Sequence, residues 1–346
     1  MFFCPSVVSG AGPHAPTIAY AGAGDGVSKI HQLLERRREE LGAATKWRVG
    51  RRIPTAGLLS GHALPTADLV AVGCTTRQAR RLPAASSLVL PFRLHLIVDV
   101  DGDPAELRRR TSRRAFQQFN ADRKVRDWRF EHTTQVSAFD HFYDRMHVPT
   151  MEKRHGERAR SESKDVAYEC LFRHGVLFFV TTGGVRVAGA LCHWDPKGRV
   201  LTMRLLGVLG GEQQHYDTGA FRALYHLLLE WSYRHDVRQV DFGGTEAWIA
   251  KGIFQWKRKF RPRVVLAPNH TGFKRVWWHA ATDTTAVREF LVANPVLELM
   301  EPGELRSVYF YDNDRPPRFD YAYQCDNVKE RRTVHLDSFL RASKGD

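Results

Sequence analysis

Two short segments of the 346-residue chain concentrate basic side chains in a pattern that suits binding to polyanions. Residues 107–129 hold nine basic and two acidic side chains, and residues 251–275 hold eight basic and no acidic ones. Together they carry +15, so the other residues sum to −1 of the formal net charge of +14. A solvated helix face usually mixes the two signs of charge, whereas concentrated positive charge attracts polyanions. The pattern favours a nucleic-acid or polyphosphate partner, and the alternative is a basic surface without a partner.

The connection over residues 206–220 is a second feature with a chemical use. It joins a predicted strand to a predicted helix, and a helix N-terminus offers free N–H groups and the positive end of the helix dipole. The connection therefore predicts an anion site, with a simple glycine-rich link as the alternative.

Several other functions lack their sequence signatures. The 16 histidines show no ligand spacing, so we expect no metal. The five cysteines are scattered and form no C-x-x-C pair, which argues against a zinc ribbon or disulfide framework and indicates a reducing, cytoplasmic location. The glycine-rich run at 21–26 lacks the G-x-G-x-x-G spacing, so we expect a flexible turn.

Membrane insertion and secretion are also disfavoured. No apolar run approaches the roughly 18 residues of a membrane-spanning helix, so no span is expected. The first 25 residues carry no Lys or Arg and so lack the basic region of a secretory signal.

The elements that would position these features are clearest in the second half. Apolar runs separated by turn residues predict strands over 176–181, 185–194 and 199–208. Apolar residues at helical spacing then predict a helix over 218–235, followed by a strand over 237–242. A strand–helix–strand unit is normally a right-handed crossover between parallel strands, so we expect a mixed sheet.

The first half gives weaker signals. Residues 1–26 are expected to be loose, and a helix is predicted over 28–41. A mostly apolar strand is predicted over 88–100, followed by a long basic helix over 104–126 that begins at a proline. A further helix is predicted around 139–146, closed by Pro149.

Three stretches resemble motifs of the Gcn5-related N-acetyltransferase (GNAT) superfamily, and of its FemABX-type branch in particular. Residues 142–149 (FYDRMHVP) with 154–156 (RHG) are similar to the branch's "FY…M…P…R.G" pattern. Residues 241–244 (DFGG) resemble a strand end of the branch, and residues 252–260 (GIFQWKRKF) resemble its "GL..FK..FG" segment. The resemblance covers roughly residues 85–325, and the basic helix lies where the branch carries an Arg/Lys-rich helix.

This resemblance implies an α/β (α+β) fold, in which a GNAT-like mixed β-sheet is flanked by helices, arranged as two GNAT-like domains. We expect a divergent N-terminal domain over residues 1–150, including the basic helix 104–126, and a C-terminal domain over residues 151–346.

The resemblance also implies an activity. Many FemABX-type proteins take an amino acid from aminoacyl-tRNA and form an amide with an amine, without a separate cofactor. The implied partners are the acceptor stem and 3′ end of tRNA and an amine-bearing cell-wall precursor or small natural product. Such a stem is recognised through its phosphates and 2′-hydroxyls, with stacking at its single-stranded end. The aromatic residues among the basic side chains fit that mode, and core packing is their alternative: Phe254, Trp256, Phe260 and Trp277.

The chemistry needs two substrates held together, a stabilised oxyanion and a proton acceptor. The acid–base candidates near the expected cleft are His215, Tyr216, Asp241 and Glu246, each with a structural role as the alternative. The candidates for binding substrate or tRNA are Arg109, Arg110, Arg113, Arg114, Trp256, Lys257, Arg258, Lys259 and Arg261. The lysine at 257 occupies the "FK" position, where the resemblance implies a contact with substrate phosphate or the acyl-bearing end of the donor.

The chain departs from the superfamily at the acetyl-CoA loop, which normally reads R/Q-x-x-G-x-G/A. Residues 214–220 read QHYDTGA, and Asp217 would repel a pyrophosphate. Trp256 replaces the usual Phe before the lysine, and Arg261 replaces the glycine after the last Phe. The alternatives are an acyl-CoA-dependent N-acyltransferase, with CoA as its cofactor, and a non-catalytic nucleic-acid-binding protein.

Overall fold

The computed structural model describes residues 2–103, 105, 108–109, 111–156, 161–300 and 303–341. Contacts within the chain form two units. Unit 1 comprises Met1–His95, Gly244–Arg258 and Val264–Asp346, and unit 2 comprises Leu96–Gly243 and Lys259–Arg263. Each unit is discontinuous in sequence, whereas we expected one boundary near residue 150. Local patterning does not show which distant segments pack together, because it contains no information on long-range pairing.

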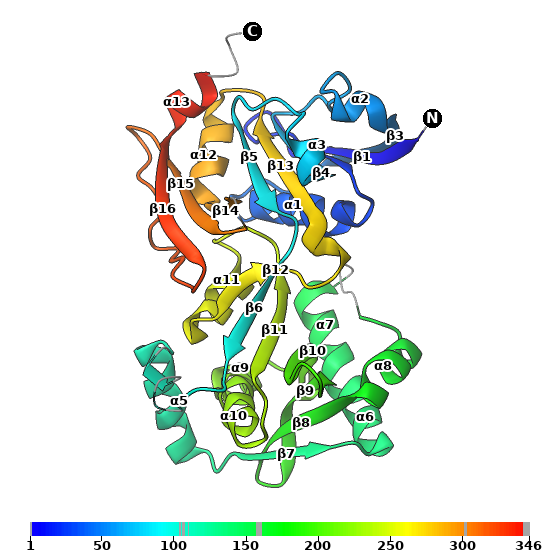
Figure 1. The fold of residues 1–346 in the computed structure, drawn as a ribbon, viewed down its shortest axis with the longest axis vertical. Helices are drawn as coiled ribbons and strands as arrows, with labels where there is room; N and C mark the ends of the chain where they lie inside the picture. The colour runs from blue at the N-terminus through cyan, green and yellow to red at the C-terminus, as the bar shows by residue number, and fades with distance from the viewer. Residues whose placement is uncertain are drawn as a thin grey trace. The chain divides into compact units, whose positions relative to one another are not determined.

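Unit 1 is built on a mixed sheet with the strand order β3-β1-β2-β4-β13-β5 (Figure 1). Its strands are β1 (Phe3–Gly10), β2 (Ile18–Gly22), β3 (Trp47–Pro54), β4 (Leu69–Thr75), β5 (Ser87–Pro91) and β13 (Lys274–Ala280). The β2–β4 pair is parallel, and the other pairs are antiparallel. Its helices include η1 (Val27–His31), α1 (Gln32–Glu39), α2 (Thr55–Leu59), α3 (Thr76–Ala79), α11 (Gly252–Lys257) and η7 (His270–Phe273).

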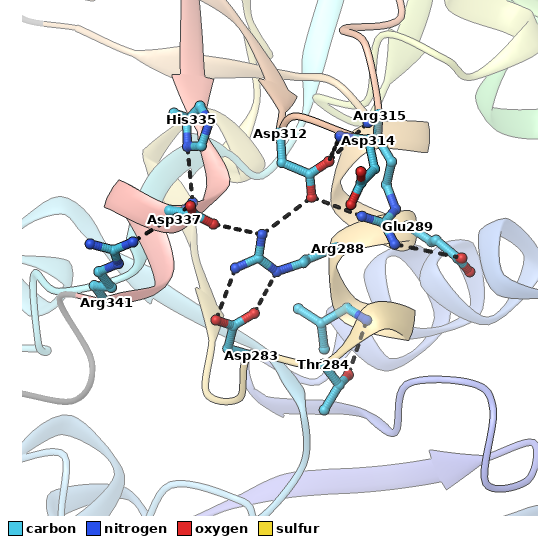
Figure 2. A network of polar contacts seen from close by, with 11 residues as sticks. Asp283, Thr284, Arg288, Glu289, Asp312, Asp314, Arg315, His335, Asp337 and Arg341 are labelled. Atoms are coloured by element: carbon cyan, nitrogen blue, oxygen red, sulfur yellow. Dashed lines mark hydrogen bonds and ion pairs between the residues drawn. The ribbon is translucent and has the colours of Figure 1, made fainter.

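A smaller sheet with the order β14-β15-β16 completes unit 1. It consists of β14 (Val296–Leu299), β15 (Leu305–Tyr311) and β16 (Val328–His335), accompanied by α12 (Thr285–Ala293) and α13 (Leu336–Arg341). Figure 2 shows the Arg288 guanidinium of α12 among the carboxylates of Asp283, Asp312 and Asp337. The Asp283 contact is bidentate, at 2.6 and 3.0 Å, so one side chain joins three segments that are distant in sequence.

Unit 2 is built on a second mixed sheet, in which the strand order β6-β11-β10-β9-β8-β7 runs across the unit (Figure 1). Its strands are β6 (Leu94–Asp99), β7 (Arg129–Thr133), β8 (Gly175–Thr182), β9 (Val185–Asp195), β10 (Val200–Val208) and β11 (Gln239–Thr245). Its helices are α5 (Arg113–Val125), α6 (Val136–Phe142), η2 (Tyr143–His147), α7 (Val148–His155), α8 (Lys164–Cys170), η4 (Phe172–His174), η5 (Leu209–Gly211), α9 (Gln214–Asp217) and α10 (Ala220–Arg234). The remaining short elements, η6 (Arg258–Phe260) and β12 (Arg263–Leu266), lie where the chain passes between the units.

The predicted α/β class and its mixed sheet are confirmed. Strands β8, β9 and β10 form an antiparallel meander, and α10 then leads to β11. Strands β10 and β11 are parallel, in a register that runs from Val200 with Gln239 to Thr202 with Asp241. Beyond that register β10 continues to Val208 and then to the turn before α9, which is the arrangement that the GNAT resemblance implies.

Three predictions for the first half were wrong. The described part of this range, residues 2–26, is not loose, because it includes β1 and β2, and Ala19 and Ala21 of β2 are fully buried. The single strand expected over 88–100 is broken into β5 and β6 after Pro91, which lacks the N–H that a ladder requires. Pro149 does not close a helix, since it lies at the start of α7. The predicted start of the basic helix, Pro104, lies outside the described residues.

None of the helices in the described ranges has the length and apolar composition needed to cross a bilayer.

Candidate functional site

A hydrogen bond in unit 2 brings parts of the two basic segments together. The backbone N–H of Ser112 donates to the carbonyl oxygen of Lys259 at 2.6 Å. Ser112 directly precedes Arg113 and Arg114, both exposed on α5, and Lys259 lies two residues before the exposed Arg261. The contact therefore joins the start of the basic helix to a basic turn from the other segment.

The aromatic ring of Phe260 fixes this turn. The ring is buried, and its centroid lies 5.6 Å from that of Tyr225, 5.2 Å from Phe242 and 4.9 Å from His226. Phe260 is thus a core residue, as its alternative reading held. It anchors the neighbouring basic side chains to the helix and sheet of unit 2.

Arg261 adopts a backbone conformation that favours glycine. Its φ is +44°, in the left-handed region, at the position where the FemABX-type pattern has a glycine. A side chain there costs free energy, because its Cβ crowds the following carbonyl group. The chain therefore tolerates local strain to present a guanidinium at this turn.

Further exposed cations lie on α5 and just beyond its two ends. The inner face of α5 packs against α10 through the buried ring of Phe119, which stacks on the His226 ring at 4.4 Å (Figure 1). Arg109, Arg113, Arg114, Lys124 and Arg126 are exposed. We call the exposed face formed by these five residues and Arg261 the basic face. Arg110 lies outside the described residues.

Acidic side chains from elsewhere neutralise part of the second basic segment. Lys274 donates to Asp25 at 2.9 Å, and Arg263 pairs with Asp99 at 3.4 Å. Lys251 pairs with Glu246. Residues 251–275 contain no acidic side chain, but carboxylates from other segments neutralise several of their cations. In unit 2 the exposed cation of this segment is Arg261.

The predicted binding residues at the end of α11 and the start of η6 have different environments. Lys257 is buried, with 4% of its surface exposed, whereas Trp256 and Arg258 are half-buried. Arg258 Nε donates to Gln255 Oε1 at 2.7 Å, and the Gln255 amide donates to the Ile249 carbonyl at 2.8 Å. Because Lys257 is buried, it is not one of several interchangeable cations on the protein surface.

The loop before α10 does not have the form of a pyrophosphate cradle. The N–H groups of Tyr216 and Asp217 both donate to the Gln213 carbonyl, at 2.9 and 3.0 Å. The Thr218 and Gly219 N–H groups also donate within this turn, at 2.9 and 3.0 Å. A Cβ at Gly219 would lie 2.5 Å from the Asp122 carboxylate and 2.9 Å from the Arg222 guanidinium, which pair with each other at 2.6 Å, so an ion pair already lies beside the start of α10. These features disfavour binding of a diphosphate there.

Two of the acid–base candidates lie together on α9. Burial lowers the pKa of His215, although the charge of Glu212 opposes this, so the imidazole is neutral at pH 7. Burial raises the pKa of Tyr216, although Arg154 opposes it, so the phenol keeps its proton. The Arg154 guanidinium lies 3.8 Å above the Tyr216 ring. The two residues are consecutive on α9, so their side chains point in different directions. The imidazole is in the state that a base needs at neutral pH, and the phenol hydroxyl is buried without a hydrogen-bond partner among the described residues.

The other two candidates have evident partners. The Asp241 carboxylate accepts from the Gly243 N–H at 2.7 Å and so closes the turn after the paired part of β11. Glu246 contacts Arg93 at 2.9 Å and also pairs with Lys251. Burial would raise the pKa of Glu246, but the two cations lower it to about 2. Its carboxylate is therefore a weak base that balances two positive charges.

Sequence reasoning missed the contributions of Arg154 and Arg93. Arg154 belongs to the RHG motif at residues 154–156. It contacts the Tyr216 ring because α7 packs against η5, the turn after β10. That packing requires Gly211, where a Cβ would lie 2.4 Å from the Pro149 carbonyl oxygen. Arg93 gave no signal, although Gly244 leaves room for it: a Cβ there would lie 2.3 Å from Arg93 Nε.

Within the described ranges, no group of three or more His, Cys, Asp and Glu side chains is placed to hold a metal ion.

Comparisons with known proteins give distant structural similarities. No protein-family model and no curated protein sequence matches the chain. Among solved structures, FemX is 12% identical, with a TM-score of 0.42 over 75% of this chain and 80% of that one. L-PGS from Bacillus licheniformis is 11% identical, with a TM-score of 0.39 over 83% of this chain and 85% of that one. A GCN5-related N-acetyltransferase from Sphaerobacter thermophilus is 15% identical, with a TM-score of 0.33 over 80% of this chain and 75% of that one.

The structural neighbours therefore include FemX and a GCN5-related N-acetyltransferase, both at low identity. At these identities and TM-scores we take no substrate or activity from them.

Proposed function

We propose that this protein is an aminoacyltransferase that uses aminoacyl-tRNA as donor and forms an amide on an amine-bearing acceptor. The observation that carries the proposal is the junction between Ser112 and Lys259, because it joins the exposed cations of α5 to the basic turn at Arg261. RNA duplexes are bound largely through phosphates, and a cluster of cations on a fixed helix suits that mode. The N–H groups of residues 216–219 already donate to nearby backbone carbonyl oxygens, so they are not available to bind the pyrophosphate of acyl-CoA, which disfavours the acyl-CoA alternative.

The reaction itself makes modest demands. The acceptor amine attacks the ester carbonyl, the new C–N bond forms, and the C–O bond to the terminal ribose breaks. The amine loses a proton, the ribose oxygen gains one, and uncharged tRNA leaves. In this proposal His215, which is neutral at pH 7, accepts the proton from the amine and, once protonated, returns a proton to the departing ribose oxygen. Holding the two substrates together supplies much of the remaining rate enhancement.

The proposal is tested by incubating the protein with charged bulk tRNA and a pool of small amines, and identifying new amides by mass spectrometry. We expect at least one amide between an amino acid and an amine, absent when the tRNA is deacylated. The double variant Arg113→Ala/Arg114→Ala removes two cations of the basic face, so it should bind tRNA weakly and form less product than the wild-type protein. Amide formation from acyl-CoA alone, with none from charged tRNA, would contradict the proposal.

A further inference from the structure

A cavity of about 160 Å³ lies between α5 and α10 in unit 2, next to the basic face. Phe116 of α5 forms one wall, and His226, Leu229 and Tyr233 of α10 form another. The volume is smaller than a typical metabolite site and matches one planar ring system. The acid–base candidates do not line this cavity, so it is separate from the proposed reaction centre.

His226 and Glu230 also line the cavity. His226 is 5% exposed, and its Nε2 is buried with no hydrogen-bond partner among the described residues. Because Nε2 has almost no accessible surface, an occupant of the cavity meets other atoms of the His226 ring rather than this nitrogen. Burial lowers the pKa of His226 to about 3, so the ring is neutral. The Glu230 carboxylate accepts from Arg123 at 3.1 and 3.2 Å.

The charges around the cavity fit a ligand that carries phosphates outside it. Arg108 and Arg234 line the cavity, and Arg113 and Arg114 follow on the exposed side of α5. Aromatic rings that stack a base, beside cations that bind the backbone, are the usual means of holding single-stranded nucleic acid.

We propose that this cavity receives one unpaired nucleobase of a bound RNA whose phosphates lie on the basic face. The base lies against the side chains of Phe116, His226 and Tyr233. This inference rests on the proposed function, because it assumes that the basic face binds RNA. It adds that the protein selects for a single-stranded segment beside the duplex.

The test compares a blunt RNA hairpin with the same hairpin carrying a short single-stranded 3′ tail that contains 2-aminopurine. The wild-type protein should prefer the tailed hairpin by about 5- to 150-fold, the effect of one base stack, and 2-aminopurine fluorescence should fall on binding. Phe116→Ala and Tyr233→Ala should each reduce this preference. Tyr233 is 43% exposed, so its loss leaves the fold intact. The matched control, Lys124→Ala, should weaken binding of both hairpins equally, since it removes only an exposed cation.

The outcomes separate this inference from the proposed function. Equal binding of the two hairpins by the wild-type protein overturns the cavity assignment alone, and so does an unchanged preference in both cavity variants. The latter result would fit a cavity for a free aromatic metabolite instead. Binding of neither hairpin contradicts RNA recognition by the basic face, and the cavity assignment then fails with it.

Discussion

The Ser112 N–H donates to the Lys259 carbonyl oxygen at 2.6 Å, and this bond determines where the two basic segments meet. One partner directly precedes α5, and the other precedes the buried ring of Phe260. Because both ends are held by packed elements, the cations beside them are presented on a fixed framework. Preorganised charges bind phosphates with less loss of side-chain and loop entropy than charges on a mobile tail.

The first prediction concerns the salt dependence of RNA binding. Replacing Arg113 or Arg114 by alanine should weaken binding and reduce the slope of log K against log salt by about one per lost phosphate contact. The measurement is a titration of tRNA at several salt concentrations. Arg173→Ala is the control, because Arg173 is an exposed cation paired with Glu169 in the same unit, and it should leave the slope unchanged. A wild-type affinity that does not vary with salt would contradict the role of the basic face.

The second prediction concerns Lys257, which is buried. If it contacts the donor or acceptor, Lys257→Ala should depress turnover of bound substrate far more than RNA affinity. Lys259→Ala should instead lower affinity and leave turnover nearly unchanged. Single-turnover rates at saturating tRNA, with dissociation constants measured separately, distinguish the two effects. Equal losses of affinity and unchanged turnover in both variants would show that Lys257 has no special role.

The third prediction uses the backbone of Arg261. Arg261→Gly removes the strain of a φ of +44°, so it should stabilise the fold by about 1 kcal/mol while weakening RNA binding. Thermal unfolding and an RNA titration give the two readouts. Asn327→Gly, at a φ of +75° in unit 1, is the control that should leave RNA binding unchanged. A destabilised Arg261→Gly variant would contradict the reading of this position as strained.

The fourth prediction is the pH dependence of transfer. Since burial places the pKa of His215 below its usual value, the imidazole is neutral at pH 7 and becomes charged only as the pH falls through its lowered pKa. A role as base therefore predicts a rate that is level near neutrality and declines at acidic pH. In His215→Ala the rate should fall by about 10²- to 10⁴-fold and lose this acidic limb. If the rate of His215→Ala still declines at acidic pH, the decline belongs to another titrating group, and His215 is not the base.

The fifth prediction concerns the Arg288 network in unit 1. Arg288→Ala leaves three carboxylates without their shared cation and should destabilise the protein by about 1.5–3 kcal/mol. Burial would raise the pKa of Asp312, but Arg288 and Arg315 lower it below its usual value. Its contribution is therefore present above the ordinary pKa and is lost as the pH falls through the lowered one. Urea unfolding at neutral and acidic pH should show a smaller pH dependence in Arg288→Ala than in the wild-type protein.

The predictability of the fold followed the strength of the local signals. The meander was evident because Gly183-Gly184 and the turn at 195–198 separate long apolar runs, and β8 to β10 lie where expected. Strands β1 and β2 were missed because glycine, alanine and proline weaken strand propensity, and only burial in the sheet overrides it.

The candidate site was less predictable, because it depends on contacts across long sequence separations. The distribution of charged residues in the sequence located the two basic segments. It did not show that Arg93 pairs with Glu246, because the two residues are 153 positions apart and no local pattern joins them. The junction at Ser112 likewise depends on how α5 packs. The predicted acid–base residues stay predictions, although their local environments now distinguish the pair on α9 from Asp241 and Glu246.

The most direct test of the account is a donor competition in a single reaction. The protein is mixed with an amine acceptor, tRNA charged with ¹³C-labelled amino acids, and deuterated acetyl-CoA, and the amide products are resolved by mass. The account predicts ¹³C-labelled amides whose formation stops when ribonuclease is added. Deuterated amides that persist after ribonuclease treatment, without ¹³C-labelled ones, would contradict it.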